Sequence, residues 1–316
     1  MLKGLSINLN GLGKGFKRKW IKDSVRDNKA NFLCVQETKV EDLMVSDVTS
    51  IWGSRSCGWE AVPSVGNSGG MVTIWDNCSF DLSSSQKERN FLVVSGTWKS
   101  INLLCGIINV YAPQEDRRKR ELWADIQDII TADPERCWIV CGDFNEVRSP
   151  EERLGSSFSS SAALRFNNFI EESGLIDINM GGRKFTYMRP NGASLSKLDM
   201  FLVSLNFCDL WPNANVTALP LLHSDHCPIL IDSNSPDFGP SPFRFFSSWL
   251  DDTGIEQVVG DSWNAQWPGL SVFSKTEKLA RKLRALKTDL KKWRVEVNNR
   301  KGEQSKDLKP KLLPLT

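Results

Sequence analysis

The chain has 316 residues and a formal net charge of +2, with 40% hydrophobic and 25% charged residues, a composition typical of a soluble globular protein with a large core. No stretch approaches the roughly 20 consecutive apolar residues of a membrane-spanning helix, and Lys3 followed by the polar run 8–11 leaves no apolar region for a secretion signal. Eight cysteines without a Cys-x-x-Cys pair favour reduced, buried thiols over a disulfide framework or a zinc site.

In chain order, short apolar runs alternate with amphipathic segments. We predict a strand at 2–9, a basic helix at 16–28, strands at 30–36, 69–75, 91–98 and 101–111, a helix at 117–130, a strand at 137–141, a helix at 160–173, and strands at 198–203 and 227–231. This mixture predicts an α/β protein in which helices cover the faces of sheets.

The pattern changes after residue 233, where the predicted first domain, 1–233, ends. Residues 234–242 are rich in Pro, Ser and Gly and are predicted to be a linker. Residues 243–316 are predicted to form a basic, mainly helical connector and tail, beginning with the aromatic cluster 243–249. In the helix predicted at 275–300, apolar residues follow a heptad spacing that indicates either a partner surface or a helix packed on its own domain: Leu279, Leu283, Leu286, Leu290, Trp293 and Val297.

The net charge is divided unevenly between these parts. Residues 1–237 carry 25 Lys and Arg against 29 Asp and Glu, a net charge of −4, and residues 238–316 carry 15 against 9, a net charge of +6. The acidic part is compatible with a carboxylate metal site, and the basic part with binding to nucleic acid. A solvated helix face explains the basic part equally well.

Polar motifs recur at the ends of the predicted strands. They are Asn-Leu-Asn-Gly-Leu at 8–12, Gln-Glu-Thr-Lys at 36–39, Tyr-Ala-Pro at 111–113, Gly-Asp-Phe-Asn at 142–145, Ser-Lys-Leu-Asp at 196–199 and Ser-Asp-His at 224–226. Polar side chains at sheet ends, on loops held by a rigid core, are where active sites usually lie.

These residue types match the needs of metal-assisted phosphodiester cleavage, which requires a bound cation, an activated water and stabilisation of a leaving oxyanion. Mg²⁺ prefers oxygen ligands, and Glu37 follows a buried strand, where it is either a ligand or a solvated surface residue. Asp143 and Asn145 alternate around Phe144, so that both face one side or simply form a turn.

Two further residues are candidates because of their surroundings. Asp199 enters an apolar strand and needs a partner, and His226, one of only two histidines, is the candidate, because a carboxylate orients an imidazole and stabilises its charged form. Tyr111 is either a core tyrosine or a phosphate contact.

The ordered set of motifs resembles the endonuclease/exonuclease/phosphatase superfamily, and within it the endonuclease domain of plant LINE-type (non-LTR) retrotransposons, over residues 2–233. The run 142–148 and the pair Glu152-Arg153 carry the plant-like character. The resemblance implies a four-layer α/β sandwich of the DNase I-like type, in which two packed mixed β-sheets are flanked by helices. The C-terminal part resembles the connector that precedes a reverse transcriptase.

The resemblance also implies roles for individual residues. Glu37, Asn8 and Asp225 would hold Mg²⁺, with Mn²⁺ as an alternative. Asn10, Thr186 and Lys197 would contact the substrate, with Lys197 standing where the family usually has Arg. The catalytic residues would be His226, Asp143, Asn145, Asp199 and Tyr111.

The implied activity is a Mg²⁺-dependent nicking of one DNA strand that leaves a 3′-hydroxyl, which primes reverse transcription in the nucleus. Retrotransposon RNA or a protein partner would bind the basic helix 275–300. The scarcity of histidine, with only His223 and His226, disfavours the branches of the superfamily that use an additional upstream His. Two alternatives stay open: an abasic-site or exonuclease III-like repair nuclease, and a catalytically idle, transposon-derived binding protein.

Overall fold

The computed structural model divides the chain into two compact units, Met1–Pro236 and Asp237–Thr316, which are described separately. None of the helices in the described residues is long and apolar enough to cross a membrane. The linker predicted at 234–242, the tail and all of the aromatic cluster except Trp249 lie outside the described residues. The described residues are 1–13, 15–66, 68–233, 249–250, 252–265, 278–279, 281–290, 292–294 and 297.

The first unit contains a seven-stranded mixed sheet in the order β11-β15-β16-β1-β2-β4-β3. Strands β1 and β2 are parallel and end side by side at Asn8 and Gln36. The strand bounds are β1 Lys3–Asn8, β2 Phe32–Gln36, β3 Cys57–Val65, β4 Ser68–Asp76, β11 Met180–Gly182, β15 Asn215–Ala218 and β16 Ile229–Asp232.

A six-stranded sheet in the order β10-β14-β8-β7-β6-β5 packs against the first. Its strands β7 and β8 are parallel, and β14 runs antiparallel to β8 with Asp199 opposite Asp143. The bounds are β5 Phe80–Lys87, β6 Phe91–Trp98, β7 Leu103–Tyr111, β8 Cys137–Asp143, β10 Leu175–Asp177 and β14 Asp199–Ser204. A small third sheet consists of β9 Arg153–Leu154, β12 Tyr187–Met188 and β13 Leu195–Ser196.

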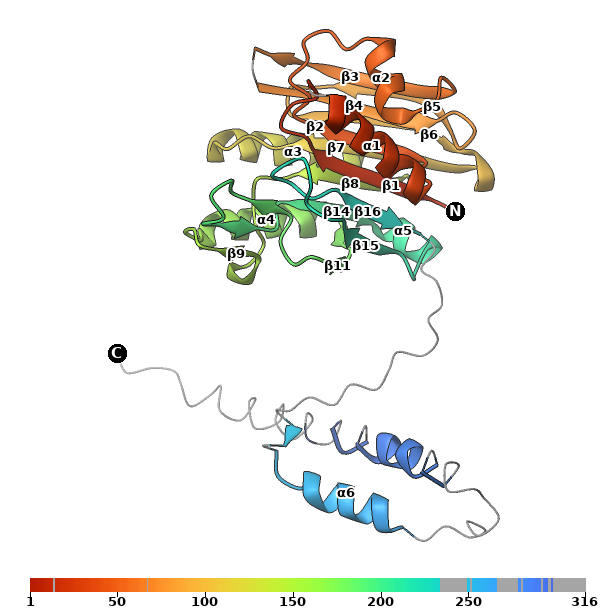
Figure 1. Ribbon diagram of the computed structural model, residues 1–316, viewed down its shortest axis with the longest axis vertical. Helices are drawn as coiled ribbons and strands as arrows, with labels where there is room; N and C mark the ends of the chain where they lie inside the picture. The colour runs from red at the N-terminus through yellow and green to blue at the C-terminus, as the bar shows by residue number, and fades with distance from the viewer. Residues whose placement is uncertain are drawn as a thin grey trace. The chain divides into compact units, whose positions relative to one another are not determined.

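The alternation of side chains along each strand divides the core into layers. In β2, Phe32 and Cys34 belong to the core between the two sheets, whereas Leu33 and Val35 belong to the core beneath the helices. Helices α1 (Gly15–Asn28) and α2 (Val45–Trp52) cover that outer face of the seven-stranded sheet (Figure 1).

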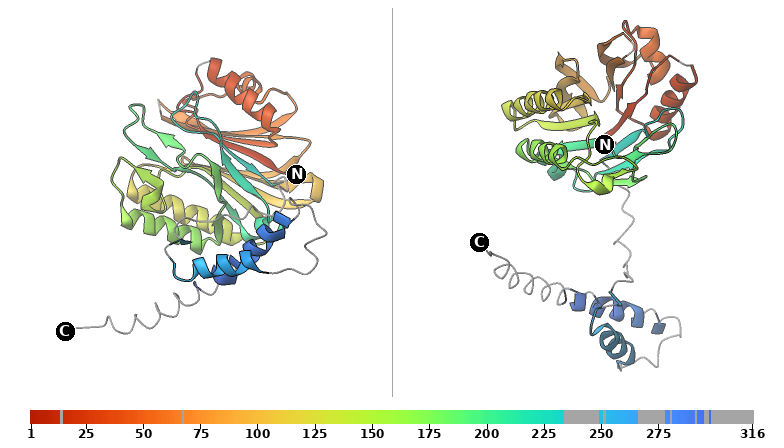
Figure 2. Two further views of the ribbon diagram at one scale, coloured as in Figure 1. Left: turned by 60° about the horizontal axis from the view of Figure 1, so that its bottom comes forward. Right: turned by 90° about the vertical axis from the view of Figure 1, so that its left-hand side faces the viewer.

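The six-stranded sheet is covered in the same way on its own outer face. Trp138 and Val140 of β8 face α3 (Asp116–Ala132) and α4 (Ser160–Glu172), which contribute Trp123, Phe166 and other apolar residues to this core. The two helix pairs lie on opposite sides of the packed sheets (Figure 2). The predicted four-layer α/β sandwich is therefore confirmed.

The predicted elements of the first unit are present, with ends that shift by one or two residues. The run predicted as a strand from 101 begins with a 3₁₀ turn, Lys99–Ile101, before β7, and the strand predicted at 227–231 is β16, which starts at Ile229. The sequence pattern missed β5 because it is a polar strand at the sheet edge, exposed at every residue after Phe80. It also missed α2, a helix of 8 residues.

The second unit has a small apolar core of its own. Ile255 is the first residue of α6 (Ile255–Asn264). It clusters with Trp249, Leu290, Trp293 and Val297. The C-terminal half of the heptad seam thus packs on its own unit, which was one of the two predicted alternatives. The N-terminal half, Leu279 and Leu283, is exposed.

Candidate active site

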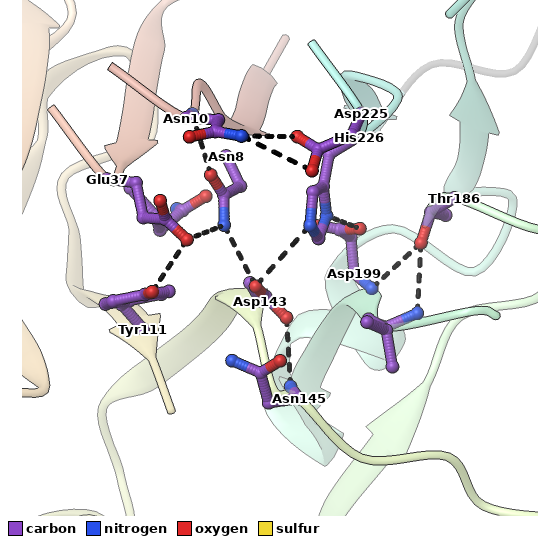
Figure 3. A network of polar contacts seen from close by, with 12 residues as sticks. Asn8, Asn10, Glu37, Tyr111, Asp143, Asn145, Thr186, Asp199, Asp225 and His226 are labelled. Atoms are coloured by element: carbon purple, nitrogen blue, oxygen red, sulfur yellow. Dashed lines mark hydrogen bonds and ion pairs between the residues drawn. The ribbon is translucent and has the colours of Figure 1, made fainter. Parts of the chain in front are cut away.

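The polar ends of strands from both sheets meet at one site, and Asn8 joins them. Asn8 lies at the end of β1, and its Nδ2 donates to Glu37 Oε1 at 3.2 Å and to Asp143 Oδ2 at 2.9 Å (Figure 3). Glu37 directly follows β2, and Asp143 ends β8 in the other sheet. A single buried amide therefore links the carboxylates of the two sheets.

Local backbone geometry aims these side chains. Glu37 and Asn145 have φ values of 51° and 48°, in the left-handed region that non-glycine residues rarely adopt. Gly142 has φ 140°, and a Cβ atom there would lie 2.0 Å from the carbonyl oxygen of Val110, so only glycine allows β7 and β8 to approach this closely just before Asp143. Glu37 directly follows β2, and Gly142 and Asn145 flank the end of β8. Unusual backbone conformations of this kind cluster at functional sites, where the surrounding structure holds them.

Tyr111 closes the network on the side of Glu37. Its hydroxyl donates to Glu37 Oε1 at 2.6 Å. Burial, together with this bond, raises the pKa of the Tyr111 hydroxyl well above its usual value. Tyr111 is therefore a neutral hydrogen-bond donor at physiological pH.

His226 lies between two carboxylates. Its Nδ1 is 2.8 Å from Asp199 Oδ2, and its Nε2 is 3.8 Å from Asp143 Oδ2. The backbone amides of Leu198 and Asp199 both donate to the hydroxyl of Thr186, at 3.0 and 3.1 Å, which fixes the start of β14. The predicted contact between Asp199 and His226 is therefore present in the structure.

The pKa values of Asp143 and His226 are both raised above those of the isolated groups. Burial raises the pKa of Asp143 to about 6 and Asp199 adds to the rise, while His226 opposes it. Burial alone would lower the pKa of His226, but Asp199 and Asp143 outweigh it and raise that pKa to about 10. At neutral pH the site holds an imidazolium between two carboxylates.

Asp225 and Asn10 form the outer edge of the site. Asn10 Nδ2 lies 3.4 Å from both carboxylate oxygens of Asp225. Ser224 belongs to the motif 224–226, although the sequence assigned it no role. It donates from Oγ to the carbonyl of Asn8 at 2.8 Å and ties this loop to β1. Lys39 Nζ lies 3.3 Å from Glu37 Oε2 and also bonds the side chain of Asn10.

The donor set fits a divalent cation. The cations in ion-pair contact with the site's carboxylates, among the described residues, are His226 and Lys39, which leaves two negative charges unbalanced. The four carboxylates are Glu37, Asp143, Asp199 and Asp225.

A second arrangement of potential ligands is also present. Donor atoms of Asp143, Asp199 and His226 lie within 4.8 Å of one another. Both ring nitrogens of His226 already face carboxylates, and a protonated ring has no lone pair to offer a metal. The oxygen-rich side around Glu37, Asn8 and Asp225 is therefore the better match for a hard cation.

These side chains open onto a pocket of about 430 Å³. The ring of Tyr187 packs 4.9 Å from that of His226. The sequence assigned no role to three other wall residues, Gln114, Arg153 and Arg189, because they are ordinary surface residue types. The pocket is lined by Glu37, Gln114, Asp143, Asn145, Arg153, Ser156, Tyr187, Arg189, Ser194, Ser196, Leu198, Asp225 and His226.

The residues predicted to contact the substrate, Asn10, Thr186 and Lys197, do not line this pocket. Thr186 is buried and holds the backbone of Asp199. Lys197 Nζ bonds Asp177 Oδ2 at 2.9 Å and Glu152 Oε1 at 3.1 Å. The polar side-chain atoms of Thr186 and Lys197 are thus bonded to protein partners.

Comparison with known proteins agrees with this geometry. A family model described as endonuclease-reverse transcriptase matches residues 105–230. An exodeoxyribonuclease of Bacillus subtilis (strain 168) is 21% identical over 257 residues, covering 72% of this chain and 98% of that protein. These matches support membership of the endonuclease/exonuclease/phosphatase superfamily. The chain is a hydrolytic enzyme of the nuclease class.

Solved structures share the fold of this chain. The AP endonuclease LMAP from Leishmania major superposes with a TM-score of 0.59 at 17% identity, covering 73% of this chain and 86% of that one. The 3′ phosphatase NExo from Neisseria, bound to a product DNA hairpin, gives 0.56 at 19% identity, with coverage of 73% and 99%. Both similarities concern the four-layer sandwich.

Proposed function

We propose that this chain is a Mg²⁺-dependent DNA endonuclease that nicks one strand and leaves a 3′-hydroxyl, as LINE-type retrotransposons do to prime reverse transcription. The observation that carries the proposal is the continuous network through Asn8, which links Glu37 to Asp143 and, through Asp143, to His226. It combines an oxygen-rich cation site with a buried base and a buried cation, the parts that phosphodiester hydrolysis requires.

Glu37, Asn8 and Asp225 would hold the divalent cation, which when bound neutralises the phosphate and the leaving oxygen. Asp143, ionised above a pKa of about 6, accepts the proton of the attacking water. Its Oδ1 accepts a hydrogen bond from the backbone N–H of Asn145 at 2.9 Å, which fixes the orientation of the carboxylate.

The remaining side chains stabilise the anionic phosphate. His226, charged and oriented by Asp199, donates to a phosphate oxygen. Asn145 lines the same pocket and presents an amide to the transition state. Tyr111 keeps its proton and holds Glu37 in place.

A plasmid assay tests this function. Supercoiled DNA is incubated with the wild-type chain in Mg²⁺, in Mn²⁺ or in EDTA, beside His226→Ala. We expect open circles with the wild type in Mg²⁺, none in EDTA, and a loss of at least about 100-fold in His226→Ala, the usual contribution of a positioned proton donor. Equal nicking by the two proteins would contradict the role of His226, and an inert wild type would support an idle binding protein.

An abasic-site or exonuclease III-like repair nuclease is the second candidate. It is favoured by the match to an exodeoxyribonuclease over 98% of that protein's length. Two duplexes of one sequence, with and without an abasic site, separate the candidates. Faster cutting of the intact A/T-rich duplex supports the retrotransposon function, and cutting confined to the abasic duplex supports repair.

The retrotransposon function also implies partners and a location. Element RNA or a protein would bind the basic helix 275–300, and the chain would act in the nucleus, where its DNA target lies. Crosslinking of the full chain to labelled RNA, and a fluorescent fusion imaged in cells, test these two points separately.

A further inference from the structure

A lysine is buried beneath the loop that follows β8. This loop contains Asn145 and Glu146 and is called the catalytic loop below. Lys119 of α3 is only 7% exposed, and its Nζ donates to the carbonyl oxygen of Asn145 at 2.6 Å and to Glu146 Oε2 at 2.8 Å. Glu146 is equally buried, at 6%. No motif in the sequence pointed to this pair, which joins a helix to the loop after β8.

The pair is hard to explain by stability alone. Removing two charges from water costs several kcal/mol for each ion, and apolar residues of similar volume often replace such a pair without loss. The loop residues on either side of Asn145 and Glu146 are the fully buried Phe144 and Val147, so an apolar side chain at position 119 would suit its surroundings. A buried charge retained at this position indicates that its hydrogen bonds are needed to fix the conformation of the loop.

The loop conformation to be fixed is that of Asn145. Its φ of 48° lies in the left-handed region, which Asn adopts more readily than most residues but which is still less favourable than an ordinary conformation and is stabilised by contacts. Its N–H bonds Asp143, its Nδ2 donates to the carbonyl of Ala112 at 2.7 Å, and its Oδ1 accepts from Gln114. The remaining polar atom, the carbonyl oxygen, is held by Lys119.

We propose that Lys119 is a positioning residue for the catalytic loop: its ammonium fixes the peptide between Asn145 and Glu146, and thereby aims the Asn145 amide and the bond from Asn145 to Asp143. The inference rests on the proposed nuclease function and adds a residue that does not touch the substrate. Glu146 keeps the ammonium in place and balances its charge.

Three variants of the full chain separate positioning from stability: Lys119→Met, Lys119→Arg and the double variant Lys119→Met/Glu146→Met. Lys119→Met leaves Glu146 buried without its partner and lowers the melting temperature. We expect its kcat to fall about 10- to 100-fold, the size of effect that a misplaced catalytic group produces. KM for DNA and the Mg²⁺ concentration for half-maximal rate should stay within about twofold, because the cation site is formed by other residues.

The other two variants decide between the explanations. Lys119→Arg retains donors for both acceptors and should recover most of kcat. The double variant removes both charges, so its melting temperature should return to that of the wild type while kcat stays low. A double variant with wild-type kcat would overturn the proposal, because it would show that the pair serves stability only.

A matched control comes from another lysine–carboxylate pair. Lys3 pairs with Asp232 at 2.7 Å at the opposite end of β1 from Asn8. Lys3→Met should leave kcat unchanged, and a fall equal to that of Lys119→Met would overturn the proposal. If the wild type cuts DNA and Lys119→Met cuts it equally well, the inference fails and the function stands; if the wild type does not cut, the function itself has failed.

Discussion

Two clusters of partly or fully buried charged side chains adjoin the start of β14, and they differ in how the charge is balanced. On one side, Glu152 and Asp177 are matched by Arg148 and Lys197. On the other, the carboxylates around Asn8 outnumber their cations. A balanced cluster needs no further ligand, whereas an unbalanced one is costly unless a cation binds. The difference separates a structural cluster from a functional one.

Removing the base should have the largest effect. Asp143→Asn keeps the shape of the side chain and its place beside Asn8 but cannot accept a proton. We expect the nicking rate to fall by about 10³-fold or more, within the range for a lost general base. The rate is measured on supercoiled plasmid at saturating Mg²⁺, with folding checked by circular dichroism. A variant with more than a tenth of wild-type activity would show that Asp143 is not the base.

Removing one of the unbalanced carboxylates should weaken the binding of Mg²⁺. Glu37→Gln removes one of the unbalanced charges and one ligand. We expect the Mg²⁺ concentration for half-maximal rate to rise at least about tenfold, because Mg²⁺ prefers anionic oxygen ligands. Titration of the rate with Mg²⁺ measures this. An unchanged midpoint would mean that the cation binds elsewhere, for example at Asp143 and Asp199.

The pH profile should report the functional cluster. Below a pKa of about 6 Asp143 is protonated and cannot act as a base, so kcat/KM should fall about tenfold per pH unit on the acid side, while His226 keeps its charge up to about pH 10. A bound cation lowers the pKa of Asp143 that sets the acid limb of the profile. In His226→Gln, loss of the imidazolium raises the pKa of Asp143, so the acid limb should move to higher pH. A limb that moves to lower pH would contradict this coupling.

The balanced cluster should respond through stability rather than activity. Lys197→Met removes one partner of Asp177, which keeps Arg148, and one partner of Glu152. We expect a loss of about 2 kcal/mol in the free energy of unfolding, below the 3–5 kcal/mol of a fully buried pair. KM for DNA should change less than about twofold, because Lys197 does not line the pocket. Urea unfolding measures the free energy of unfolding, and nicking kinetics on the same sample measure KM for DNA. A large rise in KM with unchanged stability would restore Lys197 as a substrate contact.

The smallest effect should come from the basic second unit. Deleting 238–316 removes a net charge of +6 and should weaken DNA binding at low salt and flatten its dependence on salt concentration. The Mg²⁺ dependence of nicking should remain. Affinity equal to that of the full chain at low salt would show that this part does not contact DNA.

Much of the site could be predicted because its residues belong to short local motifs at strand ends. Glu37, Asp143 and His226 each follow or precede a predicted strand, and the structure brings all three to one pocket. The supporting residues could not be found in this way. Lys119 lies in the first turn of α3, on a helix where a lysine ordinarily faces solvent. Ser224 belongs to the motif 224–226, but its contact with Asn8, like that of Tyr187 with His226, joins residues distant in the sequence.

The sequence by itself determined the alternation of buried and polar positions, and hence the strands, the covering helices and the side chains at strand ends, because these depend on periodicities of a few residues. Only the tertiary structure decided which charges meet. Asn8 and Asp143 are 135 residues apart, and Lys197 is turned to Glu152 and Asp177 rather than to the pocket. Such pairings depend on how two sheets and their loops pack, which no local pattern contains.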